Sequence, residues 1–479
     1  MAFIALIALR KCYRGSRLTV LFYFEGTSES SLHDLAKDNC FAFSYVIFDS
    51  NASQYVSQNK YELTVQDPKV SGEDGRSTYV VDSSNKLISC RVGKGVETLN
   101  MPDPIGPYHI YNIDANIFAN YCNLKMVSLP ASVQTIGENA FKGCHNLATV
   151  VFNNSSVQIG ENAFKTQDYT GAQHINCSGV AADPDGTPKV KLKFVGEISS
   201  QSTPYLYAMS ENGRYNNASQ VKSYVTYCSG WPSNLIVQYN SEKQVSELTD
   251  FPAFSELKKY ADNPDDYPYL TDEQRSAAET ALNKYGNSSL TENEQSFIDS
   301  ALNIKIPDGV QAIADGLYKS KETRDEQAGY TGLEKTVTLW GLDNIEAEDF
   351  QGATSLTALI SNGDMSSIEE GAFKGCTNLK KVEINGNTTS IGDKAFEDCN
   401  ALTDVTLSGT ITDLGIIPFT GCENLKSVNF TGTDYFSCDN SIIYGMSNGT
   451  KARIIECLEG RDSKYVKADE TAGVTSLAP

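Results

Sequence analysis

Cysteines and carboxylates return at a fixed spacing in this chain, and both residue types can do chemistry. Four cysteines each stand three residues after a phenylalanine and three before a leucine: Cys144, Cys376, Cys399 and Cys422. Acidic residues recur beside the same phenylalanines: Glu138, Glu161, Glu348, Glu369, Glu370 and Asp393. Thiolates bind zinc or carry redox chemistry, whereas paired carboxylates bind calcium or exchange protons. The first question is whether these columns are sites or parts of a scaffold.

The repetition itself argues against chemistry. Tyr121, Gln167 and Ala353 occupy the cysteine position in other copies, a substitution that a catalytic or metal-binding thiol would not tolerate. We therefore expect small, buried thiols that burial makes inert. The carboxylates share one phase of the repeat, which predicts a solvated ridge, with weak calcium binding as the alternative. The sequence has no C-x-x-C or H-E-x-x-H spacing, so we expect no metal and no cofactor. We expect Cys438 and Cys457 to remain unbridged.

Composition excludes several classes of function. The chain has 479 residues, too many for one ordinary core, and a formal net charge of −21. This charge repels phosphate backbones and anionic lipid, so binding of nucleic acid or of a membrane surface is not expected. The apolar run from Ala2 to Leu9 is too short to span a bilayer, and its positive charges follow it instead of preceding it. We interpret the chain as lacking its own secretion signal; a buried strand is the alternative.

A period of 23 residues organises much of the chain. Two sets of phenylalanines follow it: Phe118, Phe141 and Phe164, then Phe350, Phe373, Phe396 and Phe419. Tyr318 marks a further copy. A leucine stands six residues after most of these rings, and segments such as LKKVEI then alternate with the period of a strand. The charged stretch before each phenylalanine predicts one helical or 3₁₀ turn. Such a unit cannot bury its apolar face alone, so neighbouring units must stack.

The segment VSLPASVQTIGENAFKGCHNL, from Val127 to Leu147, resembles the BspA-like leucine-rich repeat of bacterial cell-surface proteins. The segment FSCDNSIIYGMSNGTKARIIECLEG resembles the hairpin that such proteins place between arrays. The resemblance covers about half of the chain. It implies an α/β repeat solenoid with a parallel sheet on one face. It also implies display on the cell surface of gut bacteria or secretion.

The two arrays are separated by a segment that lacks the period. Its strand-like stretches are followed by two helices, with capping boxes expected at Thr271 with Gln274 and at Thr291 with Glu294. Trp231 could form a stacking platform for a ligand, although we favour a core role. We predict four segments: a β-rich N-terminal flank (1–85), the first array (86–165), an α+β insert (166–304), and the second array with a terminal spacer hairpin (305–479).

No P-loop, dinucleotide fingerprint, nucleophile elbow or zincin motif is present in the sequence, so we expect a protein that is not an enzyme. We predict instead a monomeric, extracellular or surface-displayed adhesion protein that binds through outward strand residues, which differ between copies while the core positions do not. These candidates are Met126, Ser128, Thr149, Val151, Ala358, Ile360, Lys381, Glu383, Asp404, Thr406, Ser427 and Asn429. The resemblance implies a host extracellular-matrix protein, a bacterial surface protein or a glycan as partner. A structural spacer in a longer wall-attached chain and a glycan-active enzyme are the alternatives.

Overall fold

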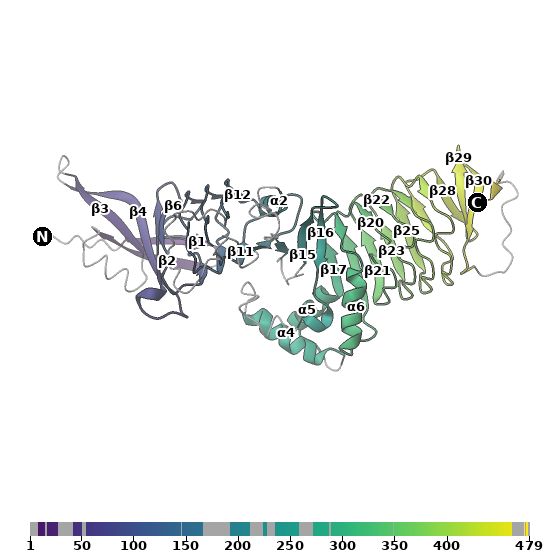
Figure 1. Cartoon of the computed structure of the whole chain (residues 1–479), viewed down its shortest axis with the longest axis horizontal. Helices are drawn as coiled ribbons and strands as arrows, with labels where there is room; N and C mark the ends of the chain where they lie inside the picture. The colour runs from purple at the N-terminus through teal and green to yellow at the C-terminus, as the bar shows by residue number, and fades with distance from the viewer. Residues whose placement is uncertain are drawn as a thin grey trace. The chain divides into compact units, whose positions relative to one another are not determined.

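The computed structural model of the chain is shown in Figure 1. It describes residues 8–14, 17–26, 42–49, 54–144, 146–165, 192–210, 224–227, 235–257, 272–286, 289–347, 349–461, 474 and 476–477. Trp231, Thr271, Glu348 and the first residues of the N-terminal apolar run lie outside these ranges. The chain divides into two compact units, the first formed by 1–197 with 201–225 and the second by 198–200 with 226–479. The boundaries of the four segments above stay a prediction.

The first unit begins with the expected β-rich flank. Its strands are β1 (Ala8–Arg14), β2 (Arg17–Gly26), β3 (Ala42–Asp49), β4 (Gln54–Gln66), β5 (Arg76–Asp82) and β6 (Lys86–Arg91), with a 3₁₀ turn η1 (Glu73–Gly75) before β5. Within the flank β2 pairs parallel with β3 and the other neighbours pair antiparallel. Strand β6 then pairs parallel with the first short strand of the array, β8 (Asn112–Ile113). The flank therefore continues directly into the first array.

The first array has two parallel sheets. The longer strands are β7 (Thr98–Asn100), β9 (Met126–Leu129), β11 (Thr149–Phe152) and β13 (Lys193–Gly196). The short strands that follow β8 are β10 (Thr135–Ile136) and β12 (Gln158–Ile159). Helix α2 (Thr203–Met209) begins at Ser202, whose side chain accepts a hydrogen bond from the Tyr205 amide. Each 23-residue unit, which we call a rung, thus consists of one longer strand, one short strand and the two turns that join them.

The second array repeats this plan. Its six-stranded sheet contains β17 (Asn303–Ile306), β19 (Lys335–Leu339), β21 (Leu356–Ser361), β23 (Lys381–Ile384), β25 (Asp404–Ser408) and β27 (Asn429–Thr431). The second sheet contains β20 (Asn344–Ile345), β22 (Met365–Ile368), β24 (Thr388–Ile391) and β26 (Asp413–Leu414). All neighbouring strands in both sheets are parallel. The period places residue i beside residue i+23, as with Lys381 and Asp404.

Stacked rings form the core between the two sheets. Phe118, Phe141 and Phe164 lie at centroid distances of 4.7 and 5.1 Å, nearly parallel. In the second array the centroid distances between successive rings of the column that runs from Phe350 to Phe419 are 5.2, 5.2 and 5.3 Å. Tyr318 extends this column, since its ring lies 5.4 Å from Phe350. The prediction that the phenylalanines are one stacked core is confirmed.

The expected helical turn before each phenylalanine is wrong. Those residues form hydrogen-bonded turns, and in the described ranges five rungs have two left-handed residues four positions apart, such as Asn139 (φ 56°) with Gly143 (φ 83°) and Lys394 (φ 52°) with Asp398 (φ 60°). A left-handed residue ends a right-handed helix, so no helix can continue through these turns. The chain instead turns twice per rung and adds the second, short-strand sheet.

Helices occur where the second array begins. The hairpin of β15 (Ile236–Asn240) and β16 (Val245–Asp250) is followed by η2 (Phe254–Glu256), α4 (Asp272–Lys284) and α5 (Glu292–Leu302). The capping box at Thr291 and Glu294 is confirmed. Leu282 and Tyr285 pack with buried Ala278, as their helical spacing predicts. The strand β18 (Ala312–Ile313) pairs with β16, and α6 (Leu317–Gln327) then replaces the tight turn of an ordinary rung. Figure 1 shows these helices in teal and green.

A hairpin ends the second array. Its strands β28 (Phe436–Asp439), β29 (Ile442–Ser447) and β30 (Thr450–Cys457) pair antiparallel, and β31 (Ser476–Leu477) then pairs parallel with β30. In ordinary rungs the phenylalanine amide donates to a backbone carbonyl of the next rung, as Phe396 does to Pro418. Phe419 donates instead to Glu456 Oε2 at 3.1 Å, so a carboxylate takes the place of the missing carbonyl.

Candidate binding surface

The predicted surface residues of the second array lie in columns on one face of the six-stranded sheet, which we call the strand face. Ala358, Lys381 and Asp404 are in register, and Ile360, Glu383, Thr406 and Asn429 form the adjacent column. The alternate residues, such as Val382 and Ile384, point into the core and are fully buried. The period-2 pattern therefore positions the predicted residues on one face.

Ten of the twelve candidates are half-buried or exposed. Asp404, Ser427 and Asn429 are exposed, and the other seven are half-buried. Met126 and Val151 are exceptions, with exposed fractions of 7% and 5%. Val151 lies beside Val195 of β13, which is itself fully buried, so apolar side chains gather there instead of facing solvent. The expectation that Met126 and Val151 are exposed is wrong.

The strand face is wider than the sequence prediction. β17 and β19 add four further polar side chains: Asn303, Lys305, Thr336 and Thr338. The alternation in NIKIP and KTVTLW is the signal that could have found them. Trp340 follows β19 and keeps 38% of its side chain exposed, although large apolar side chains are usually covered.

The strand face is electrically balanced. In the second array its charged members are Lys305, Lys381, Glu383 and Asp404, two positive and two negative, within a chain of net charge −21. Lys381 Nζ lies 2.8 Å from Glu383 Oε1, so these two charges neutralise each other on one strand. Hydroxyl, amide and small apolar groups make up the remainder. Such a surface offers hydrogen bonds without a strong electrostatic preference.

One edge of the strand face is bare backbone. Gly363, Gly386 and Gly409 follow successive strands at the repeat spacing, after Trp340. A Cβ atom on Gly386 would lie 1.9 Å from the Gly363 carbonyl oxygen, so the rungs approach too closely there for a side chain. Beside this column Asn385 donates to the Asn362 side chain at 3.2 Å.

The repeated thiols are structural. Each donates to the carbonyl of the preceding phenylalanine rung, as Cys144 does to Phe118 and Cys376 does to Phe350, both at 3.0 Å. Burial raises the pKa of the Cys144 thiol to about 12. Contacts with Cys376 and Cys422, together with burial, raise the pKa of Cys399. The prediction that the repeated thiols are buried is confirmed. Their hydrogen bonds were not predicted, and their inertness stays a prediction.

The remaining cysteines and the recurring carboxylates also show no sign of a chemical site within the described ranges. Cys438 and Cys457 are free, as expected, whereas Cys122 is disulfide-bonded. The acidic ridge is exposed at Glu138, Glu161, Glu369 and Glu370, and Asp393 is half-buried. Within the described ranges, no group of three or more histidine, cysteine or acidic side chains could hold a metal ion. In the same ranges no helix has the length and apolar character that crossing a membrane requires.

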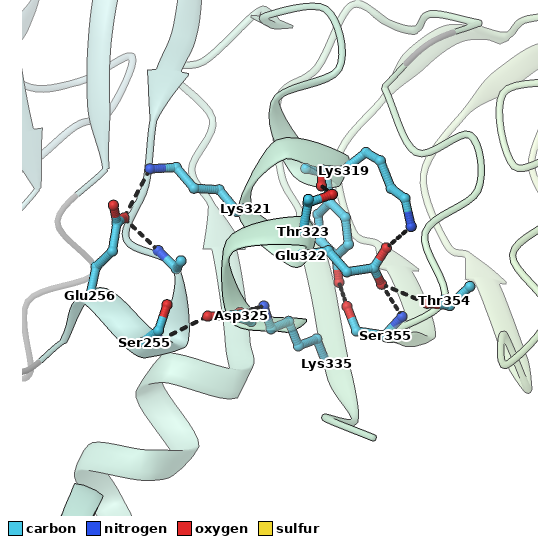
Figure 2. Close-up of polar contacts among 12 residues, drawn as sticks. Ser255, Glu256, Lys319, Lys321, Glu322, Thr323, Asp325, Lys335, Thr354 and Ser355 are labelled. Atoms are coloured by element: carbon cyan, nitrogen blue, oxygen red, sulfur yellow. Dashed lines mark hydrogen bonds and ion pairs between the residues drawn. The ribbon is translucent and has the colours of Figure 1, made fainter. Parts of the chain in front are cut away.

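A network of buried charges surrounds α6 (Figure 2). Glu322 accepts hydrogen bonds from the Ser355 amide and, at 3.1 Å, from Thr354 Oγ1. Lys321 contacts Glu256 of η2 at 3.1 Å, while Asp325 pairs with Lys335 at 2.7 Å. These contacts tie the helix to η2 and to the strands of the array. The sequence analysis did not find this network, because its members fall outside the 23-residue period.

A second buried acid lies near the start of the same array. Asp349 is 1% exposed and accepts one hydrogen bond, from the Glu346 amide, while its Oδ1 atom has no partner. Burial raises the pKa of Asp349 to about 8. Lys243 forms ion pairs with Glu346 and Asp315 nearby. The arrangement joins the β15–β16 hairpin to the first rungs of the array.

Parallel strands, stacked rings and hydrogen-bonded turns at one period define a leucine-rich repeat protein. The family model described as "BspA type Leucine rich repeat region" matches in six copies, at residues 107–178 and 331–454. These two stretches are therefore similar to BspA-type leucine-rich repeats, as the resemblance implied, and they make up less than half of the chain.

Solved structures of similar proteins come from several bacteria. A leucine rich cell surface protein from Faecalibacterium prausnitzii is 16% identical, with 78% of this chain and 94% of that chain covered and a TM-score of 0.24. A leucine-rich repeat protein from Bacteroides ovatus is 17% identical, with 76% and 92% covered and a TM-score of 0.23. The pneumococcal vaccine antigen PcpA is 12% identical, with 81% and 85% covered and a TM-score of 0.19. The search of curated proteins gave no match.

Proposed function

We propose that the chain is a surface-displayed binding protein that holds its partner on the strand face of the second array. The observation that carries the proposal is that core positions keep the same residue from rung to rung, whereas strand-face positions do not. Phenylalanine, leucine and cysteine recur in the core, whereas Ala358, Lys381 and Asp404 differ although they occupy one column. Residues that maintain the fold repeat, and residues that are free to change chemistry are the ones exposed to a partner.

The residue types on the strand face favour a protein that binds a partner over an enzyme. The repeated thiols are buried, and of the two carboxylates on the strand face Glu383 is paired with Lys381. The similar proteins include one whose description reads "cell surface protein", which supports display at the cell surface here. A host matrix protein, a bacterial surface protein and a glycan are the candidate partners.

A screen of the full chain against immobilised matrix proteins and glycans tests the proposal. Two aspartates of one rung provide a matched pair: Asp404 lies on the strand face in β25, and Asp413 lies in β26 of the opposite sheet, and both are exposed. Asp404→Arg should weaken any saturable binding about tenfold or more, which corresponds to about 1.4 kcal/mol. Asp413→Arg makes the same change of charge and should leave binding unchanged.

Two results would contradict the proposal. Equal loss in both variants would mean that binding follows overall charge and not the strand face. No saturable binding to any member of the screen would support the structural spacer instead. Turnover of a polysaccharide in the same screen, lost on carboxylate substitution, would support the glycan-active enzyme.

A further inference from the structure

Lys335 occupies a position that the repeat otherwise gives to leucine. It begins β19 and lies in register with Leu356, the fully buried leucine of the next rung. The side chain of Lys335 is 2% exposed. Burying an ammonium group in place of a leucine costs several kcal/mol unless its charge is compensated or removed. A lysine at this position therefore needs a chemical reason.

The surroundings of the Lys335 amine contain one carboxylate within bonding distance. Nζ lies 2.7 Å from Oδ2 of Asp325 in α6, and the Tyr318 ring centroid lies 6.0 Å away. Asp325 is also 2% exposed. Among the ion pairs of the described ranges, this is the one in which both side chains are nearly excluded from solvent. Lys321, the other buried lysine of the network, pairs with Asp250, whose side chain is 49% exposed.

The two oxygens of Asp325 have different partners. Oδ1 accepts the amide hydrogen of Ser255 at 2.8 Å, whereas Oδ2 faces the lysine amine (Figure 2). The amide donor polarises the carboxyl group through the oxygen that would remain after a condensation. The oxygen that would leave is the one beside the amine. The amine and the carboxyl group are thus held side by side, which is the proximity that an acyl transfer from carboxyl to amine requires.

We propose that Lys335 and Asp325 form an intramolecular amide bond. A proton passes from the ammonium group to Oδ2, giving a neutral amine and a carboxylic acid. Nζ then attacks Cγ, a second proton moves from Nζ to the Oδ2 hydroxyl, and the Cγ–Oδ2 bond breaks. One N–C bond forms and one water leaves; nothing is oxidised or reduced, and no co-reactant is consumed.

A cavity lies beside the reacting pair. It has a volume of about 60 Å³ and is lined by Lys335, Asp325 and Glu322 among other residues, so it has room for the water that is released. The bond replaces two buried charges with one neutral amide whose oxygen keeps the hydrogen bond from Ser255. It links α6 covalently to the first strand after it, at the junction between the helical insert and the regular rungs.

Mass spectrometry of the full-length chain tests the proposal directly. The reduced, alkylated and denatured protein should be lighter than its sequence mass by one water molecule. Trypsin should fail to cleave after Lys335 and release one linked peptide from Asp325 to Lys374. Cleavage after Lys321 in the same digest is the internal control, because that lysine is buried but has a solvated partner.

The variant Lys335→Met fits the leucine position and cannot form the bond, so it should have its full sequence mass. A wild-type protein of full mass that is cleaved after Lys335 would overturn the proposal. Loss of water with normal cleavage after Lys335 would also overturn it, since this would indicate a cyclic imide at an aspartate instead of a cross-link.

Discussion

Glu456 lies where the hairpin meets the last rung of the second array, and Glu456→Gln should change how stability depends on pH. The residue is 6% exposed, and its Oε2 atom accepts the amide hydrogen of Phe419. Burial raises the pKa of the Glu456 carboxyl from 4.5 to about 7, and the nearby Glu459 adds to this rise. The hydrogen bond from Phe419 acts in the opposite direction and does not cancel it.

The direction in which stability changes with pH depends on whether the folded or the unfolded chain binds the proton of Glu456 more tightly. The folded chain has the higher pKa, so it binds the proton more tightly than the unfolded chain does. The stabilising contribution of protonated Glu456 is complete below pH 4.5 and is lost as the pH rises to about 7. At about 1.4 kcal/mol per pKa unit, the ionised carboxylate costs about 3 kcal/mol above pH 7.

Glutamine resembles the protonated acid, because its carbonyl oxygen can still accept the Phe419 amide hydrogen. At pH 8 the Glu456→Gln variant should therefore be more stable than the wild type by up to about 3 kcal/mol, whereas at pH 4.5 the two should agree. The difference between the two proteins, followed from pH 4.5 to 8, isolates Glu456 from other titrating groups such as Asp349.

Urea unfolding and hydrogen exchange of the Phe419 amide are the appropriate measurements, because a repeat array can open locally at its end. Glu459→Gln is the control. Glu459 accepts the Gly421 amide hydrogen but is exposed, so this change should be within about 0.5 kcal/mol at every pH. Parallel pH curves for wild type and Glu456→Gln would refute the reasoning. A variant less stable than the wild type at pH 8 would refute it as well.

Two core substitutions and one at the edge of the strand face test the stacking of the rungs by urea unfolding. Phe396→Ala should lower the free energy of unfolding by about 3–5 kcal/mol, since it deletes a fully buried ring stacked on both sides. Cys399→Ala should cost only about 1–2 kcal/mol, mostly the hydrogen bond to Phe373 O, and a loss equal to that of Phe396→Ala would contradict this. Gly386→Ala should cost about 2 kcal/mol or more because its Cβ would collide with Gly363 O, and a neutral effect would mean that the rungs can separate.

Much of the fold was predictable because the repeat turns sequence distance into spatial distance. A residue and the one 23 positions later become neighbours, so Phe373 identifies Phe396 as its stacking partner without any structure. The alternation of KVEI likewise identifies which of Lys381 and Val382 faces outward. The second sheet was missed because some of its strands, such as β26, have only two residues. Two residues are too few to show the alternation of buried and exposed side chains that identifies a strand.

The candidate surface was predictable only in part. Alternation identifies a face of a strand, but it does not show what lies over that face, and so Met126 and Val151 were expected to be exposed. The polar residues of β17 and β19 were missed because α6 interrupts the period between them. The exposure of a side chain depends on every segment that packs against it, and a local sequence pattern carries no information about those segments.

The sequence by itself determined the repeating core and the burial of the repeated cysteines, because both depend on neighbours at one constant spacing. Only the tertiary structure decided how the arrays end and where charge is buried. Glu456 reaches Phe419 across 37 positions, and Ser255 reaches Asp325 across 70, distances unrelated to the repeat. At such places the chain must satisfy backbone groups that the next rung would otherwise bond, and the residue that does so is chosen by proximity in space.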